Sequence, residues 1–307
     1  MSEHKTPAAH LALGLAFAVV GVICFSLRPV LIKLAYAYVV DPITLLALRM
    51  IFSAPFFVAV ALWTHRSGSP APAISRRDMA AVVVLGLLSY YLASFLDFLG
   101  LQYITAGLGR LLQFIYPTVV VILSALFLGK RATRRDIAAL AVTYIGLVLV
   151  FWHALGGEQL NLWLGAALVF ISATCYATYL VAGSAVIIRV GSMRFTAYAM
   201  LVASAACVIQ FFVLRPVTAL DLPLPVYGYA VAMALFSTVI PGFLIAEALR
   251  RIGANHVAIV GALGPVTAIA LGYLGLDEIM TPLQILGSSF VLIGVVVVSV
   301  KPRAAKA

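Results

Sequence analysis

The stretch LGLQYITAGLGRLLQFIYPTVVVILSALFLGKRAT at residues 99–133 decides the fold. It carries no charged residue between Arg110 and Lys130, so it is long enough to cross the hydrocarbon core of a bilayer, which takes about 20 helical residues. Lipid offers no partner for backbone N–H and C=O groups, so such a segment must close its own hydrogen bonds as a helix. Strands of a membrane barrel would show short alternating segments instead. The stretch therefore predicts a membrane-spanning helix over residues 104–128.

The rest of the chain has the same apolar character. Of its 307 residues, 64% are hydrophobic and only 10% are charged, whereas soluble domains are about half apolar and a quarter charged. The hydrophobic residues, about 196 in number, match the need of ten spans of about 20 residues each. We therefore predict an all-α integral membrane protein with ten transmembrane helices, at residues 12–36, 43–63, 79–100, 104–128, 135–152, 162–187, 196–214, 226–248, 255–276 and 283–300.

The net charge of +10 does not indicate nucleic-acid binding, because the basic residues form short runs beside apolar segments, as juxtamembrane anchors do. Counted on alternate sides of the membrane, fifteen Lys and Arg residues fall on one side, and only Arg215 falls on the other. The fifteen are Lys5, Arg66, Arg76, Arg77, Lys130, Arg131, Arg134, Arg135, Arg189, Arg194, Arg250, Arg251, Lys301, Arg303 and Lys306. The positive-inside rule places both termini in the cytoplasm. The first span lacks a small-residue cleavage site, so we expect it to be retained as a helix.

The two halves of the chain repeat each other. A shift of 151 residues aligns LALGLAFAVVGVICF with LWLGAALVFISATCY, and a shift of 148 residues pairs Pro117 with Pro265. Each copy has five predicted spans, an odd number, so the second copy enters the membrane from the opposite face. The sequence therefore predicts two inverted five-helix repeats, over residues 11–152 and 162–300.

Four motifs, two of them repeat equivalents, resemble the drug/metabolite transporter superfamily in its EamA-like branch. They are LIKLAY at 31–36, ALRM at 47–50, the stretch at 99–133, and LRRIGANHVAIVGALGPVTAIALGYLGLDEIMTPLQILG at 249–287. The chain departs from the family pattern at Phe25 and Ser26, where members often have a Trp-Gly pair, and at Lys130, where an acidic residue is common. The resemblance implies export or exchange of small metabolites across a bacterial inner membrane, including amino acids, purine-like compounds and amphiphilic toxicants.

Ionisable side chains inside the spans mark candidate functional sites, because each costs several kcal/mol in lipid unless it is paired or hydrated. Five lie in the outer half of the first repeat, four positive and one negative: Arg28, Lys33, Arg49, Arg110 and Asp97. This surplus of positive charge would attract an anion. Arg28 is the deepest, about 15 Å below the outer end of its helix at about 1.5 Å per residue, and we expect it to bind the substrate. Lys33 lies near the interface and is interpreted as an anchor.

The other ionisable residues have two interpretations each. Arg49 resembles the arginine that the family has in its second helix, and it either ties helix ends together or contacts the substrate. Arg110 and Asp97 flank the outer turn LGLQY, so we expect an ion pair that closes the external gate, with substrate contact as the alternative.

Neutral residues complete the predicted site. Gln113, Tyr90, Tyr116 and Tyr176 offer hydrogen-bonding groups at the depth of a central cavity, and aromatic rings also stack on planar ligands. Pro117 and Pro265 each remove an N–H from a helix and permit a bend. We expect these two helices to be moving walls, although membrane helices also tolerate proline without such a role.

The sequence thus predicts a secondary active transporter, and not an enzyme, that exports a small amphiphilic metabolite, an amino acid or another carboxylate-bearing compound, by alternating access. The first alternative is an exchanger of phosphorylated or nucleotide-linked sugars, which would use Arg28, Arg49 and Arg110 together. The second is a non-transporting membrane enzyme or accessory subunit, but no GxxxxGK[ST], HExxH or GxSxG motif is present. No cofactor or metal is predicted. The expected partners are a small-molecule substrate, the lipid bilayer and protons as a candidate coupling ion.

Overall fold

The computed structural model describes residues 7–66, 74–128, 137–138, 141–146, 148–149, 161–261, 263–276 and 281–299. These residues form helices and turns, and no strand occurs among them. Six helical stretches are long and apolar enough to cross a membrane: Leu11–Tyr36, Pro42–Thr64, Arg76–Gly100, Leu162–Gly183, Ser192–Leu214 and Leu224–Ile245. The chain is therefore a multi-pass membrane protein that is helical across its described residues. The six stretches coincide with six of the ten predicted spans, while most of the predicted span at 135–152 lies outside the described residues.

The helices of the first half are short pieces as well as full spans. They are α1 (Pro7–Ser26), α2 (Arg28–Tyr36), α3 (Pro42–Arg66), α4 (Arg76–Gly86), the π-helical turn η1 (Leu87–Ala93), α5 (Ser94–Gly100), α6 (Ala106–Gln113) and α7 (Tyr116–Leu128). The second half contains α9 (Leu162–Val190), α10 (Ser192–Leu214), the 3₁₀ turn η2 (Val217–Leu220), α11 (Leu224–Ala234), the π-helical turn η3 (Leu235–Val239), α12 (Ile240–Gly261), α13 (Leu263–Leu276) and α14 (Pro282–Ser299).

Prolines account for several of the breaks. Pro29 is the second residue of α2, after a turn at Leu27, and Pro117 is the second residue of α7. Pro265 is the third residue of α13. A proline is tolerated in the first turn of a helix because the N–H that it lacks would have no partner there. The chain is thus interrupted just before Pro29 and Pro117, whereas residue 262, between α12 and α13, lies outside the described residues. The role of Pro117 and Pro265 as moving walls remains a prediction.

The two π-helical turns are separated by the same number of residues as the two copies of the sequence repeat. η1 begins at Leu87 and η3 begins at Leu235, which are 148 positions apart. A π-helical turn leaves a carbonyl free for a side chain, and the Ser172 hydroxyl donates to the carbonyl of Ala93 at 2.6 Å. The same local irregularity at equivalent positions agrees with the repeat in the sequence.

One predicted boundary is wrong. We expected one span to end at residue 248 and the next to begin at 255, but α12 runs without interruption from Ile240 to Gly261. No proline follows Pro241 in this segment, and Glu247 accepts a hydrogen bond from Arg251 Nε at 2.7 Å, one turn further along. Such a pair supports a helix through the region.

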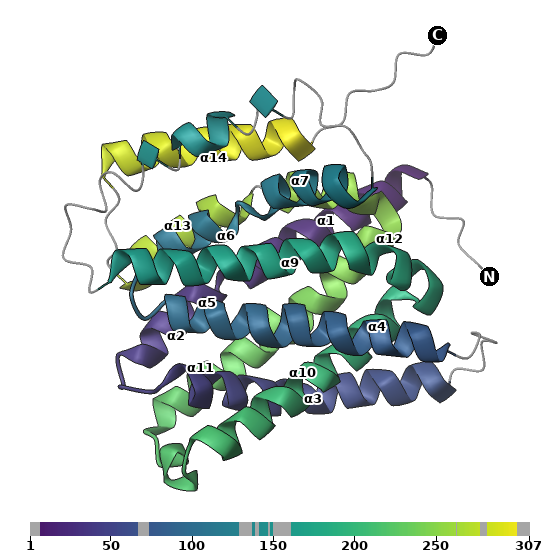
Figure 1. Ribbon diagram of the computed structural model, residues 1–307, viewed down its shortest axis with the longest axis vertical. Coiled ribbons are helices and arrows are strands. Elements are labelled where there is room, and N and C mark those ends of the chain that lie inside the picture. The colour runs from purple at the N-terminus through teal and green to yellow at the C-terminus, as the bar shows by residue number, and fades with distance from the viewer. Residues whose placement is uncertain are drawn as a thin grey trace.

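Helices from the two halves pack against each other throughout the bundle, as Figure 1 shows. The contacts join α1 to α12, α3 to α10, and α4 and α5 to α9. The largest cluster of buried apolar side chains draws on both halves, with residues from α2, α3 and α5 and from α10 and α11. The two halves therefore share one core.

Two ion pairs also join the halves. Asp41, just before α3, binds Arg215 at the end of α10 with 3.0 Å between Oδ1 and Nε. Asp78, in the first turn of α4, binds Arg189 in the last turn of α9 with 2.6 Å between Oδ1 and Nη2. In each pair the acid sits at a helix N-terminus and the arginine at a helix C-terminus, where the helix dipoles favour these charges.

Candidate functional site

The buried ion pair between Arg28 and Asp97 is the centre of the site. The break at Leu27 makes Arg28 the first residue of α2, and Asp97 comes from α5. Arg28 Nη2 lies 2.8 Å from Asp97 Oδ2, and the two residues are only 7% and 3% exposed. The contact lacks linear hydrogen-bond geometry, since Asp97 Oδ2 and Arg28 Nε both have no hydrogen-bond partner. Both groups therefore keep unused hydrogen-bonding capacity.

Arg110 contacts the same aromatic ring as Arg28. Its guanidinium carbon is 5.5 Å from the centre of the Phe25 ring, and that of Arg28 is 4.8 Å from it. Arg110 also lies 6.0 Å from the Phe114 ring, within the range of a cation–π contact. α13 approaches closely, because a Cβ atom at Gly264 would lie 2.8 Å from Arg110 Nη2. Gly264 therefore makes room for the guanidinium.

Arg49 completes the set of buried cations from α3. It is 2% exposed, its guanidinium carbon lies 5.0 Å from the Phe98 ring, and its Nη2 atom is 3.9 Å from Met50 Sδ. The charge of Arg28 acts on both Arg49 and Arg110, so the three arginines form one electrostatic cluster. Against these three cations the described residues bury a single anion, Asp97. The cluster thus favours an anionic ligand, because a buried charge is costly without a partner.

An aromatic row leads away from the arginines. The ring of Tyr116 packs edge-on against Phe114 at 5.6 Å and against Tyr176 at 5.2 Å between ring centres. Tyr176 stacks on Tyr179 at 5.9 Å, and the Tyr179 hydroxyl lies 3.0 Å from the Tyr90 hydroxyl. The three tyrosines that the sequence singled out therefore lie in one connected row, which Tyr179 completes.

The remaining predicted residues lie at the helix breaks around the cluster. Gln113 is the last residue of α6, and its Oε1 atom is buried without a hydrogen-bond partner. Pro117 is the second residue of the helix that follows the break after Gln113, and Pro265 is the third residue of α13. Ser26, beside the break at Leu27, donates to the carbonyl of Gly264 at 3.2 Å and so links α1 to α13. Two described helix breaks, at Leu27 and after Gln113, therefore lie at the arginines.

The expected pair between Arg110 and Asp97 is not the one that forms. Asp97 is paired with Arg28, while Arg110 turns towards Phe25 and Phe114. Asp97 and Arg110 flank the same turn but do not pair, because Asp97 on α5 faces Arg28 at the start of α2. Sequence reasoning also missed the rings of Phe25, Phe98 and Phe114 as platforms for the guanidinium groups. Tyr179 could have been identified from the sequence, because it occupies the position in the second repeat that corresponds to Arg28 in the first.

The fold and the site define a multi-pass helical membrane protein with a buried, positively charged cluster where broken helices meet, an arrangement found in membrane transporters. A family model confirms this class, because it matches residues 12–152 and again 163–300. The chain belongs to the EamA-like transporter family. The resemblance seen in the motifs is thereby confirmed, and membership of a transporter family confirms that the chain is not an enzyme.

Curated relatives carry transporter names. The chain is 30% identical to the uncharacterized transporter YcbK of Bacillus subtilis, over 93% of this chain and 92% of the relative. It is 27% identical to the S-adenosylmethionine/S-adenosylhomocysteine transporter of Chlamydia trachomatis serovar L2, over 73% and 70% of the two chains. It is 26% identical to a probable terminal-alkyne amino-acid exporter of Streptantibioticus cattleyicolor, over 73% and 74%.

A crystal structure supports the fold. It superposes with a TM-score of 0.67 at 17% sequence identity, and the match covers 92% of this chain and 94% of the other. The partners that follow from the family are a small-molecule substrate and the membrane.

Proposed function

We propose that the protein is a secondary active transporter that exports a small amphiphilic metabolite carrying a carboxylate, such as an amino acid, across the bacterial inner membrane. The observation that carries this proposal is the buried cluster of Arg28, Arg49 and Arg110, in which Asp97 is the single buried acid among the described residues. Fixed cations in a low-dielectric region attract an anion, and the unused N–H group of each arginine can donate to its oxygen atoms. The tyrosine row beside the cluster offers aromatic surface to the rest of the molecule.

The names of two relatives agree with this substrate class. One is named for S-adenosylmethionine and S-adenosylhomocysteine and another for a terminal-alkyne amino acid. All of these molecules combine an α-carboxylate with a larger group. Such a molecule fits a site with arginine donors at one end, for the carboxylate, and aromatic rings at the other, for the larger group.

Alternating access follows from the proposed topology. Two inverted five-helix repeats, over 11–152 and 162–300, would exchange conformations around the midplane and so open the site to either side in turn. The matching π-helical turns support this symmetry. We further propose that both termini lie in the cytoplasm, as the distribution of Lys and Arg indicates, and that a proton gradient drives the cycle.

The test begins with the substrate. Comparing metabolites in the media of cells with and without the protein identifies a candidate, whose flux is then measured in proteoliposomes. We expect Arg28→Ala to abolish flux while membrane insertion is retained. Arg251→Gln is the matched control, because Arg251 is an ion-paired arginine outside the cluster, and it should transport normally. Wild-type flux in the Arg28→Ala variant would refute the assignment.

The surplus charge also favours a second candidate function. Three arginines against one aspartate leave two positive charges, and a phosphate group can carry two negative charges. An exchanger of phosphorylated or nucleotide-linked sugars would use Arg28, Arg49 and Arg110 together. Competition of flux by phosphate analogues, but not by carboxylates, would select this function over the first.

A further inference from the structure

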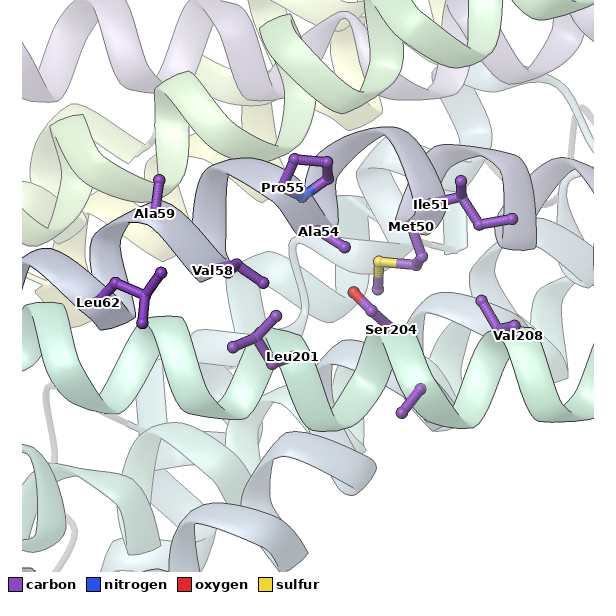
Figure 2. Close-up of a pocket in the computed structure, with 11 residues that line it drawn as sticks. Met50, Ile51, Ala54, Pro55, Val58, Ala59, Leu62, Leu201, Ser204 and Val208 are labelled. Carbon is purple, nitrogen blue, oxygen red and sulfur yellow. The ribbon is translucent and has the colours of Figure 1, made fainter.

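An apolar groove of about 670 Å³ runs between α3 and α10. Its walls are formed by residues from Met50 to Leu62 on α3 and from Leu201 to Val208 on α10, as Figure 2 shows. This volume falls within the range of about 300–1,000 Å³ that small-molecule sites occupy. The groove is separate from the aromatic row, which is built on other helices.

The open side of the groove faces lipid. Ile51, Val58 and Leu62 line it and are 42%, 42% and 54% exposed. Both helices are long and apolar enough to cross the membrane. Large apolar side chains exposed on such helices lie in the hydrocarbon of the bilayer. An alkyl chain can therefore enter the groove sideways from the membrane.

Two buried polar side chains, one in the lining of the groove and one in contact with a lining residue, each have an atom without a hydrogen-bond partner. Ser204 is 5% exposed, and its Oγ atom has no hydrogen-bond partner. In Figure 2 the Met50 side chain reaches from α3 towards Ser204 on α10. The same Met50 sulfur lies 3.9 Å from Nη2 of Arg49, whose Nε atom also lacks a partner. Met50, which is unbranched and flexible, thus lines the groove and contacts a buried cation.

We propose that the groove binds the alkyl chain of a single-chain anionic amphiphile, such as a fatty-acid anion, with its head group at Arg49. Movement of the Met50 side chain opens the path to the guanidinium, which donates to the head group. The Ser204 hydroxyl donates a second hydrogen bond at the floor. Charge complementarity selects the anion, because Arg49 has no acid of its own among the described residues.

This inference rests on the proposed function in one respect, namely that the arginine cluster receives the anionic part of a substrate. Binding in the groove needs no transport, so the two ideas can fail separately. A loss of flux in Arg28→Ala tests the transporter, whereas labelling of the groove tests the lateral site alone.

The experiment uses the purified full chain in phosphatidylcholine nanodiscs. A twelve-carbon fatty acid with a diazirine near its tail is photoactivated, and the adducts are mapped by mass spectrometry. An alcohol with the same chain and diazirine is the neutral probe. We expect the acid to label segments 50–62 and 201–208 about tenfold more than the alcohol does, because a charge-assisted hydrogen bond holds its head group.

Variants at four positions sharpen the result. Arg49→Gln should reduce labelling by the acid to the level of the alcohol. Ala54→Phe fills the groove and should remove labelling by both probes, and Val58→Trp on the same wall replaces it if that variant is not monodisperse. Ala167→Phe is the matched control, because Ala167 lies on the exposed face of α9 away from the groove, and labelling should not change.

Two outcomes would overturn the proposal. Equal labelling by both probes that survives Ala54→Phe would show only the lipid that surrounds any membrane protein. A preference for the acid that survives Arg49→Gln would place the head group elsewhere.

Discussion

Replacing Asp97 by asparagine tests the buried ion pair, because it leaves Arg28 without its counter-ion. Nη2 and Oδ2 lie 2.8 Å apart and both residues are over 90% buried. With the charge centres about 4 Å apart and an effective dielectric constant of about 20, the attraction is about 4 kcal/mol. This agrees with the loss of about 3–5 kcal/mol that follows removal of one partner of a buried pair. We therefore expect Asp97→Asn to lower the free energy of unfolding by about 4 kcal/mol and the melting temperature by about 10 °C.

A double-mutant cycle isolates the pair. Arg28→Gln alone should destabilise similarly, whereas the double variant with Asp97→Asn should lose much less than the sum, with a coupling of about 3–4 kcal/mol. Thermal unfolding of the four proteins in detergent, followed by loss of the monodisperse peak in gel filtration, gives the values. The pair of Asp41 and Arg215 is the control, since its side chains are 30% and 37% exposed and solvent screens it to a coupling below about 1 kcal/mol. Additive losses at Arg28 and Asp97 would refute the reasoning.

Two further predictions concern glycines. Gly264→Ala places a methyl group 2.8 Å from Arg110 Nη2 and should reduce flux several-fold by displacing the guanidinium, while the melting temperature changes little. Gly261→Ala meets its nearest atom at 3.7 Å and should keep normal flux, so equal flux in both variants would argue against a role for Arg110. Gly191, alone between α9 and α10, has a φ of 89°, and Gly191→Val should cost about 1–3 kcal/mol in thermal unfolding. Gly228→Ala, where nothing lies within 4 Å of the new methyl group, is the control, and a loss as large as that of Gly191→Val would contradict the role of backbone strain.

The proposed arginine site would bind the charged part of an amphiphilic ligand, and the proposed groove would bind its alkyl chain. Arg49 belongs to both, because its guanidinium is part of the buried cluster and its Nη2 atom touches the methionine that lines the groove. A variant at this position is therefore expected to alter both binding from the membrane and flux. Arg28 lies on α2 and does not line the groove, so its substitution should affect flux but not binding in the groove.

The sequence by itself determined that the chain is a helical membrane protein of this family. Apolar segments of about 20 residues leave few alternatives, because lipid satisfies no backbone hydrogen bond. The breaks beside Pro29 and Pro117 could also be predicted from the sequence, since the missing N–H is a local property of each proline. The depth of Arg28 in the membrane remains a prediction, while the structure shows that the residue is buried within the protein.

Only the tertiary structure decided which groups meet. Asp97 is three residues from the end of α5, and its nearest basic residue across the turn is Arg110, yet its partner is Arg28 on α2. The platforms of Phe25 and Phe98 and the groove beside Met50 depend likewise on how whole helices pack. Composition and spacing fix what each helix carries and how deep it lies, because these depend on the solvent and on the local backbone. The rotation of one helix against another depends on side chains far apart in the sequence. This rotation determines which residues come into contact.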